Sequence, residues 1–278
     1  MRLPESSTPA GAAGMAAILS QPARALVAVD YDGTLAPIVV HPGSAVPHPD
    51  AVATIGRLAG VIGTVAVVTG RSVADVLDLG GMRDAAGLER LVVLGQYGLE
   101  RYDAATGQRK IPEPRVGVAV ARERLPALLG VAGVSPELAI EDKGHALAVH
   151  TRRLPHPART LERLRAPLAA LAAATGLEAS LGRLVIELRP PGVDKGRALV
   201  ELARDREAGA VLFAGDDLGD LPAYDAVASL RDDGIPGVTV CSDSAEVSAL
   251  RARADIVVEG PAGVVALLAA LTAALGGG

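Results

Sequence analysis

The chain has 278 residues, of which 50% are hydrophobic and 21% charged, and its formal net charge is −5. Aromatic residues make up 2%, and an acidic chain with so few rings argues against nucleic-acid binding by phosphate contacts or base stacking. A single cysteine, Cys241, excludes an internal disulfide, and no uncharged apolar stretch reaches the length of a membrane span. These features predict a cytoplasmic globular protein.

Residues 1–21 are rich in Ala, Ser, Gly and Pro and carry one basic residue. They lack the layout of a signal peptide, so they are expected to form a loose N-terminal tail. Short runs of Val, Ala and Leu follow without polar alternation, which is typical of strands buried on both faces of a parallel sheet. Strands are predicted at residues 25–29, 64–68 and 91–94, with helices at 50–58 and 73–79 between them.

The pattern changes between about residues 103 and 190, where it predicts a helix, a hairpin, a second helix and a second hairpin. The hairpin turns are expected at Asp142-Lys143-Gly144 and Leu181-Gly182-Arg183, where Gly fits a tight turn. This segment is therefore expected to be an inserted α+β module. Its helices are predicted at 116–129 and 158–175, and its strands at 138–141, 146–151, 177–180 and 184–188.

The first pattern returns in the last third of the chain. Strands are predicted at 210–214 and 238–241, and helices at 195–204 and 263–275. Alternating strands and helices predict a doubly wound parallel sheet. The expected fold class is therefore α/β, with a doubly wound parallel-sheet core and an inserted α+β cap domain. The core is assigned to residues 22–106 and 191–278, and the cap to residues 107–190.

The string Asp30-Tyr31-Asp32-Gly33-Thr34-Leu35 directly follows the first predicted strand. Ligands of an open α/β sheet bind outside the carboxyl ends of its strands. Asp30 is then the candidate nucleophile, and Asp32 the candidate acid that protonates a leaving alkoxide and later activates water. A plain strand-ending turn is the other interpretation of Asp-x-Asp-Gly taken alone.

Two further strings place polar groups at a strand end or a helix start. Thr69-Gly70-Arg71-Ser72 follows the second strand, and a hydroxyl, a glycine and a helix N-terminus suit a phosphate group. Ser72 also has capping-box spacing to Asp75, so a simple capped turn explains this string as well. Lys195 follows Asp194, which can cap the next helix, and its ammonium could reach a phosphoryl group.

Three carboxylates lie within five positions in Gly215-Asp216-Asp217-Leu218-Gly219-Asp220, directly after a predicted strand. Such side chains repel one another unless a cation neutralises them, and an all-oxygen set suits Mg²⁺. The four strings together supply a nucleophile, an acid/base, phosphate donors, a positive charge and metal ligands. Phosphoryl transfer requires this set, and the predicted sheet can gather it at one edge.

In this order, the four strings resemble the four motifs of the haloacid dehalogenase superfamily. The resemblance extends to trehalose-6-phosphate phosphatases and covers the chain from about Ala25, with the insert where that family carries its cap. Further family-like strings are Gly95-Gln96-Tyr97-Gly98-Leu99-Glu100, Glu141-Asp142-Lys143-Gly144, His150-Thr151-Arg152 and Glu187-Leu188-Arg189-Pro190. The resemblance implies a haloacid dehalogenase-like core and hydrolysis of trehalose 6-phosphate through an aspartyl-phosphate.

The resemblance also implies a role for each matching residue. The implied catalytic residues are Asp30, Asp32, Thr69 and Lys195. The implied Mg²⁺ ligands are Asp30, the backbone carbonyl of Asp32, and Asp216, with Asp217 and Asp220 close by or acting through water. The implied substrate contacts are Gly70, Arg71, Tyr97 and Glu100 in the core, and Glu141, Lys143, Arg152 and Glu187 in the cap, where the distal sugar is held.

Two positions depart from the family pattern. Gln96-Tyr97 stands where the family usually shows His, and Gly219-Asp220-Leu221 where it usually shows Thr-Asp-Glu. The first change affects the expected sugar contacts near Tyr97, and the second keeps the three aspartates.

Two alternatives follow from the residues. Because substrate choice lies in the cap, a phosphatase for another sugar phosphate, such as sucrose or mannosylglycerate phosphate, is the alternative enzyme. A non-catalytic sugar-phosphate-binding partner of a trehalose-phosphate synthase is the alternative of another class. That alternative predicts loss of Asp30, Asp32 or Lys195, and all three are present. The synthase is also the candidate partner of an active phosphatase.

Overall fold

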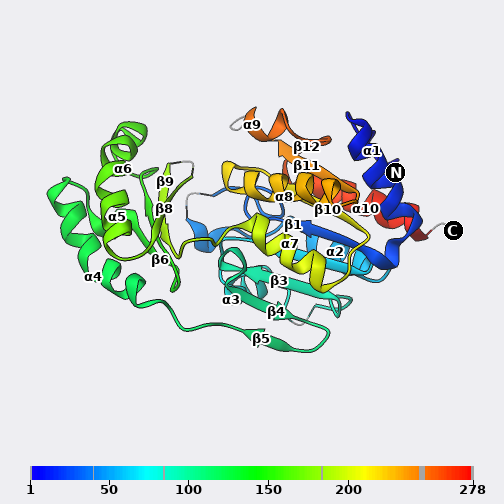
Figure 1. The fold of residues 1–278 in the computed structure, drawn as a ribbon, viewed down its shortest axis with the longest axis horizontal. Helices are drawn as coiled ribbons and strands as arrows, with labels where there is room; N and C mark the ends of the chain where they lie inside the picture. Colours follow the sequence, from blue (N-terminus) through cyan, green and yellow to red (C-terminus); the bar gives the residue numbers. More distant parts are fainter. Residues whose placement is uncertain (1, 40, 84, 183, 244–247, 277–278) are drawn as a thin grey trace. The chain divides into compact units, whose positions relative to one another are not determined.

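The computed structural model describes the chain except for residues 1, 40, 84, 183, 244–247 and 277–278. The chain forms two compact units (Figure 1). The core comprises Met1–Lys110 and Asp194–Gly278, and the cap comprises Ile111–Val193. The boundaries expected for the inserted domain, residues 107 and 190, lie four and three residues before the corresponding ends of the cap.

An eight-stranded sheet forms the centre of the core, in the order β12-β11-β10-β1-β2-β3-β4-β5. Its strands are parallel from β12 to β3, whereas β4 and β5 add an antiparallel edge. This sheet confirms the predicted α/β class, although β4, β5 and β12 are too short or too polar for the sequence pattern to reveal. The strands are β1 (Ala25–Val29), β2 (Thr64–Val68), β3 (Leu91–Gly95), β4 (Glu100–Asp103), β5 (Gln108–Lys110), β10 (Ala210–Gly215), β11 (Gly237–Asp243) and β12 (Ile256–Glu259).

Helices cover both faces of this sheet. Alternate residues of β1 point to opposite faces, so Val27 and Val29 belong to one apolar cluster and Leu26 and Ala28 to another. The first cluster includes residues of α1 (Pro9–Ser20), α2 (Ala51–Ala59), α3 (Val73–Asp78) and α10 (Gly260–Gly276). The second includes residues of α7 (Lys195–Asp205), α8 (Leu221–Asp232) and α9 (Ser248–Arg251).

The loose tail predicted for residues 1–21 is wrong, because most of this segment forms α1. The Thr8 side chain caps the helix, and Ile18 is fully buried against the sheet. Composition misleads here because the glycines are contact points: a Cβ added at Gly14 would lie 2.1 Å from the carbonyl oxygen of Gly237. The small residues therefore permit close helix–sheet packing.

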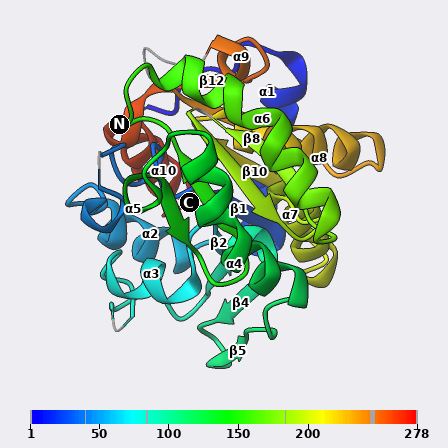
Figure 2. The same cartoon turned by 90° about the vertical axis from the view of Figure 1, so that its left-hand side faces the viewer.

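The cap is a four-stranded antiparallel sheet in the order β6-β7-β9-β8, and its helices pack on one face (green in Figures 1 and 2). The strand expected at 138–141 is partly wrong, since Pro136 begins a short helix and β6 starts at Ile140. Arg183 of the second predicted turn lies outside the described residues. The elements are α4 (Val116–Val131), α5 (Pro136–Ala139), β6 (Ile140–Asp142), β7 (Leu147–His150), α6 (Pro157–Ala174), β8 (Glu178–Gly182) and β9 (Val185–Arg189).

Short 3₁₀ helices complete the core. They are η1 (Pro22–Arg24), η2 (Pro42–Ser44), η3 (Gln96–Gly98) and η4 (Leu218–Asp220). Within the part of the chain that the structure describes, no helix combines the length and the apolar character needed to cross a membrane.

Candidate active site

Asp30 and Asp216 come together although they are far apart in the sequence. Asp30 follows β1 and Asp216 follows β10, two neighbouring parallel strands that pair Val29 with Ala214. The chain therefore leaves both strands at the same edge of the sheet, and the Asp30 amide donates to the Ala214 carbonyl at 2.8 Å. Both carboxylates are buried. Sheet topology thus joins the first and fourth motifs.

Lys195 connects the two acidic motifs. It is the first residue of α7, whose start is capped by Asp194. Its Nζ lies 2.7 Å from an oxygen of Asp30 and 2.7 Å from an oxygen of Asp220. Burial alone lowers the pKa of Lys195, but Asp220 and Asp30 outweigh this effect and raise that pKa well above its ordinary value. The ammonium is therefore a fixed positive charge within the site.

Asp220 holds the acidic loop in place. Its Oδ1 accepts from Lys195, and its Oδ2 accepts from the backbone amides of Asp216 at 2.9 Å and Asp217 at 3.1 Å. The Asp217 carboxylate accepts from the Gly219 amide at 2.8 Å and caps η4. Asp217 and Asp220 therefore both stabilise the loop, and Asp220 also fixes the lysine.

The buried acidic group fits a divalent cation. Among the described residues, oxygens of Asp30, Asp216 and Asp220 lie within 4.8 Å of one another. Burial and then the neighbouring carboxylates raise the pKa of Asp216 to about 10, and burial raises the pKa of Asp30 well above its ordinary value despite Lys195. The protein alone therefore disfavours the charged forms of these carboxyl groups, and a bound cation would stabilise them. All-oxygen ligands suit Mg²⁺. Gly33 leaves space for this group, since an added Cβ would lie 2.0 Å from an Asp216 oxygen.

The Thr69-Gly70-Arg71 turn lies at the end of β2, the other neighbour of β1. Thr69 is buried, and its hydroxyl oxygen accepts from the Arg71 amide at 3.2 Å. The segment after β3 holds this turn, because the amides of Gln96 and Tyr97 donate to the carbonyls of Arg71 (2.8 Å) and Thr69 (2.9 Å). Gln96 and Tyr97 have φ values of 49° and 58°, which are strained for residues with a side chain. The strain occurs where it fixes the candidate phosphate-binding turn.

Tyr97 and Glu100 both lie near this turn but make different contacts. The Tyr97 ring lies against Gly70, since a Cβ added at Gly70 would come within 2.7 Å of the Tyr97 hydroxyl. Glu100 is buried, and its carboxylate accepts from the Val73 amide at 2.7 Å, at the start of α3. Glu100 therefore stabilises a helix start, and its contact with substrate stays a prediction.

Asp32 and Arg71 form a two-point ion pair that sequence reasoning did not predict. Arg71 Nε and one terminal nitrogen each lie 2.7 Å from an Asp32 oxygen. Ser242 is a second residue that the sequence did not reveal. It ends up beside the site because β11 pairs with β10, and its buried hydroxyl donates to the Gly33 carbonyl at 2.7 Å. A lone serine at a strand end carries no signal for such a contact.

The predicted sugar-binding residues lie on or beside the cap sheet. Glu141 on β6 pairs with His150 on β7, with 2.7 Å between Oε2 and Nε2. Lys143 in the following turn forms an ion pair with Glu187 on β9, and Arg152 is exposed in the turn after β7. The strand register places Glu141 and Glu187 in one cross-strand row, on the face opposite the apolar cluster. His150 was part of a family-like string, but its pairing with Glu141 was not predicted.

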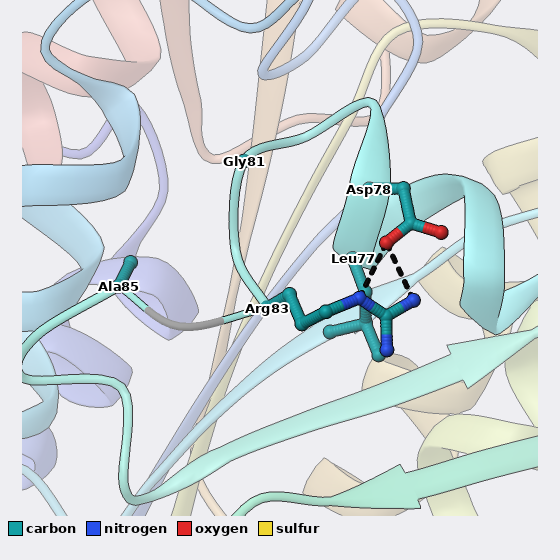
Figure 3. Close-up of a pocket in the computed structure, with 5 residues that line it drawn as sticks. All are labelled: Leu77, Asp78, Gly81, Arg83 and Ala85. Atoms are coloured by element: carbon teal, nitrogen blue, oxygen red, sulfur yellow. Dashed lines mark hydrogen bonds and ion pairs between the residues drawn. The ribbon is translucent and has the colours of Figure 1, made fainter.

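An open pocket of about 420 Å³ lies elsewhere in the core, at the end of α3 and in the loop that follows it (Figure 3). Its two charged side chains pair with each other, and Arg83 Nε lies 2.5 Å from an Asp78 oxygen. None of its lining residues belongs to the predicted site, so the candidate site stays at the carboxyl edge of the sheet. The pocket is lined by Leu77, Asp78, Gly81, Arg83 and Ala85.

Known proteins resemble this chain in sequence. The family model for trehalose-phosphatase matches residues 28–256. The trehalose-phosphate phosphatase of Mycobacterium marinum is 31% identical over 217 residues, which cover 73% of this chain and 52% of that protein. The protein of the same name from Mycobacterium avium is 33% identical over 216 residues, which cover 74% and 52%. The chain thus spans about half the length of these curated relatives.

Solved structures resemble it in fold. The C-terminal domain of trehalose-6-phosphate phosphatase from C. albicans has a TM-score of 0.76 at 19% identity, covering 98% of this chain and 99% of that chain. A haloacid dehalogenase-like hydrolase from Bacteroides thetaiotaomicron has a TM-score of 0.60 at 13% identity, covering 87% and 97%. The fold is therefore haloacid dehalogenase-like, as the four motifs imply. Since the family model matches most of its length, the chain belongs to the trehalose-phosphatase family.

Proposed function

We propose that the protein is a Mg²⁺-dependent phosphatase of trehalose biosynthesis. It hydrolyses trehalose 6-phosphate to trehalose and phosphate through a phosphoryl group carried on Asp30. The observation that carries this proposal is the buried group of Asp30, Lys195 and Asp216 at the carboxyl edge of the parallel sheet. The family match supports the substrate.

Each step of the proposed reaction has a residue to perform it. The Asp30 carboxylate attacks phosphorus, and its O–P bond forms as the bond from phosphorus to the sugar oxygen breaks. Asp32 gives a proton to that sugar oxygen, and it later takes a proton from the water that attacks the aspartyl-phosphate. As the water oxygen bonds to phosphorus, the bond from phosphorus to Asp30 breaks, which releases phosphate and restores the Asp30 carboxylate. Lys195 provides positive charge 2.7 Å from Asp30, and Thr69 and Gly70 offer a hydroxyl and a backbone amide to the phosphoryl oxygens.

The proposed metal ligands follow from which oxygens the loop already uses. Both Asp220 oxygens accept hydrogen bonds from Lys195 or from backbone amides, and Asp217 caps η4. We therefore assign direct ligation to Asp30 and Asp216 and, as the family resemblance implies, to the backbone carbonyl of Asp32. When bound, Mg²⁺ would supply positive charge to the transferring phosphoryl oxygens.

The cap residues would select the sugar. Glu141 and Glu187 lie on one face of the cap sheet. His150 lies beside Glu141, and the ammonium of Lys143 lies beside Glu187. Carboxylates and ammonium groups in such a row can accept from and donate to the hydroxyls of a sugar ring. Arg152, exposed next to this row, completes the set proposed to hold the distal ring of a disaccharide.

We extend the proposal to the protein's setting. Trehalose 6-phosphate must come from a trehalose-phosphate synthase, which is the proposed partner. The proposed location is the cytoplasm, in keeping with a single buried cysteine, Cys241, that forms no disulfide.

The substrate is tested by measuring phosphate release from a panel of sugar phosphates with Mg²⁺. We expect the highest kcat/KM with trehalose 6-phosphate, and lower values with sucrose phosphate, mannosylglycerate phosphate and glucose 6-phosphate. Activity should disappear with EDTA and return with Mg²⁺. Equal hydrolysis of glucose 6-phosphate would remove the disaccharide assignment, and full activity without metal would remove the Mg²⁺ assignment.

The metal site is tested separately by thermal unfolding, using Asp216→Asn as the matched variant. The pKa of Asp216 is raised to about 10 without metal, so its contribution to stability is present at low pH and is lost as the pH rises toward that value. Between about pH 5 and pH 9, the Tm of the metal-free wild type should therefore fall relative to that of Asp216→Asn. Mg²⁺ should raise the Tm of the wild type only. An equal rise in both proteins would argue against ligation by Asp216.

A further inference from the structure

Arg71 holds both oxygens of the candidate acid/base Asp32. The guanidinium contacts them through Nε and a terminal nitrogen, each at 2.7 Å, which is the two-point geometry that arginine forms with a carboxylate. The two residues come from different strand ends, after β1 and after β2, which are neighbours in the sheet. The pair therefore fixes the direction of Asp32 from outside its own loop.

Arg71 is itself immobilised from several sides. Its side chain is 11% exposed, whereas that of Asp32 is 42% exposed. The guanidinium carbon lies 5.1 Å from the centre of the Tyr31 ring, and Tyr31 is fully buried with its hydroxyl donating to the Ala45 carbonyl at 2.9 Å. The Arg71 carbonyl accepts from the strained Gln96 amide at 2.8 Å. The arginine is thus a rigid support for a more exposed carboxylate.

From this geometry we propose that Arg71 is a positioning residue for Asp32, in addition to the contact with phosphate implied by its motif. A carboxylate offers about four lone-pair positions, so two remain for a proton or a water molecule while the guanidinium occupies the others. Without the pair, the exposed Asp32 side chain would occupy several rotamers, and fewer molecules would have the oxygen in line with the leaving group.

The proposal rests on the proposed function, in which Asp32 gives its proton to the leaving oxygen as the phosphoryl group moves to Asp30. That proton matters most when the leaving oxygen is strongly basic, as in a sugar or in phenol. It matters less for p-nitrophenol, because the nitro group stabilises the departing anion. A residue that only positions Asp32 should therefore affect poor leaving groups more than good ones.

The experiment compares phenyl phosphate with p-nitrophenyl phosphate on the full chain with Mg²⁺. The two esters differ little in shape, and kcat/KM covers only the steps up to departure of the leaving group. Arg71→Lys keeps the charge but lacks the two-point geometry, and Arg71→Gln keeps part of the stem without the charge. Both variants should lower kcat/KM for phenyl phosphate roughly tenfold more than for p-nitrophenyl phosphate, a fraction of the 10²–10⁴ that a general acid contributes.

Two controls make the result specific. Arg83→Lys alters another Arg–Asp pair of the core, outside the site (Figure 3), and should leave the ratio of the two esters unchanged. Asp32→Asn should shift that ratio by itself, and adding Arg71→Lys to Asp32→Asn should shift it no further, because the two residues act as one unit.

The outcomes separate this inference from the proposed function. If Asp32→Asn shifts the ratio but the Arg71 variants lower kcat/KM equally for both esters, Arg71 contacts phosphate only and the positioning role is wrong. An additional shift in the double variant would also overturn it. If Asp32→Asn leaves the ratio unchanged, the acid role of Asp32 fails and the positioning role fails with it. The sugar assignment depends on neither result, since both esters lack a sugar.

Discussion

The core and the cap differ in the sign of their net charge. In the cap, Lys and Arg outnumber Asp and Glu by 11 to 8, whereas in the core Asp and Glu outnumber Lys and Arg by 24 to 16. The core buries its charged site, with Asp30, Lys195 and Asp216 at most 4% exposed. In the cap, the side chains of Glu141 and His150 are 34% and 30% exposed.

The difference in burial indicates that the core and the cap would bind their ligands in different ways. Burial raises the pKa values of Asp30 and Asp216, and neighbouring carboxylates add to this effect. In the proposed function, the core is therefore arranged for a cation and a phosphoryl group before any ligand arrives. In the cap, Glu141 and His150 stay partly hydrated, whereas Lys143 and Glu187 are largely buried as a pair. In the proposed function, the hydrogen bonds of these groups to a sugar form only when the sugar displaces water. Changes at the candidate site of the core should therefore affect every phosphate ester, and changes at the polar row of the cap only those that carry the sugar.

The largest expected effect comes from Asp30→Asn, which removes the proposed nucleophile with little change in shape. Turnover should fall at least about 10³-fold, and by the same factor for trehalose 6-phosphate and p-nitrophenyl phosphate, because both need the same attack on phosphorus. Initial rates on both substrates measure this, and circular dichroism checks that the fold is intact. A variant that keeps a tenth of the wild-type rate would show that Asp30 is not the nucleophile.

A smaller and substrate-dependent effect is expected from Lys143→Ala in the cap. It removes one charged hydrogen-bond donor and the ion pair that Lys143 forms with Glu187. The loss should be about 1–3 kcal/mol of transition-state stabilisation, or roughly 5- to 150-fold in kcat/KM for trehalose 6-phosphate. p-Nitrophenyl phosphate, which has no sugar to contact Lys143, should be hydrolysed almost as fast as by the wild type.

The matched control for the cap is Arg122→Ala. Arg122 pairs with Asp142 in the same hairpin, but both side chains are 42% exposed. This variant should change neither substrate appreciably, since exposed ion pairs contribute little. Equal losses on both substrates after Lys143→Ala would mean that Lys143 supports the fold of the cap rather than binding the sugar.

The smallest effect on activity is expected at a buried core acid outside the site. Asp255 accepts hydrogen bonds from Thr8, Thr239 and Arg231, and these outweigh the effect of burial and lower its pKa. Asp255→Asn should lower the free energy of unfolding by about 1–3 kcal/mol at neutral pH and leave kcat unchanged. Because the pKa is lowered, this stabilisation is present above the ordinary carboxyl range and is lost as the pH falls through the native value.

Denaturant unfolding at several pH values measures this contribution. The difference in the free energy of unfolding between wild type and Asp255→Asn should become smaller as the solution becomes acidic. Asp225→Asn, which removes the exposed partner of Arg253, is the matched control and should have little effect on stability. A large loss of kcat in Asp255→Asn would mean that this residue affects the candidate site. It would then not be a purely stabilising residue, unlike what its distance from the site in the sequence and its own hydrogen bonds predict.

The elements that carry the site could be predicted because parallel strands buried on both faces leave continuous apolar runs. β1, β2 and β10 lie where the runs predict them, and each is followed by a polar string. The gathering of Asp30 and Asp216 then follows from the rule that parallel strands end at one edge. The predicted Asp194 cap at the start of α7 is also confirmed, since its side chain accepts from the Arg197 amide at 2.8 Å.

Other features depend on contacts that no local pattern encodes. The Arg71–Asp32 pair exists because β1 and β2 are neighbours, which residue types alone do not reveal. The helix at Pro9–Ser20 was missed because glycine and proline suggest a flexible segment unless the partner surface is known. Likewise, the carboxylate of Asp217 could be a metal ligand or a helix cap by sequence, and its hydrogen bond to the Gly219 amide appears only in the structure.

The order of strands in the core sheet has a consequence for biosynthesis. β1 lies between β2 and β10, and β10 follows the entire cap in the chain. On the ribosome, one edge of β1 therefore stays unpaired while residues 111–193 are made, which takes about 4–17 s at roughly 5–20 residues per second. An unpaired apolar edge is a template for pairing with other chains. The strand that leads into Asp30, the proposed nucleophile, is thus exposed to intermolecular pairing for as long as the ribosome takes to translate the cap.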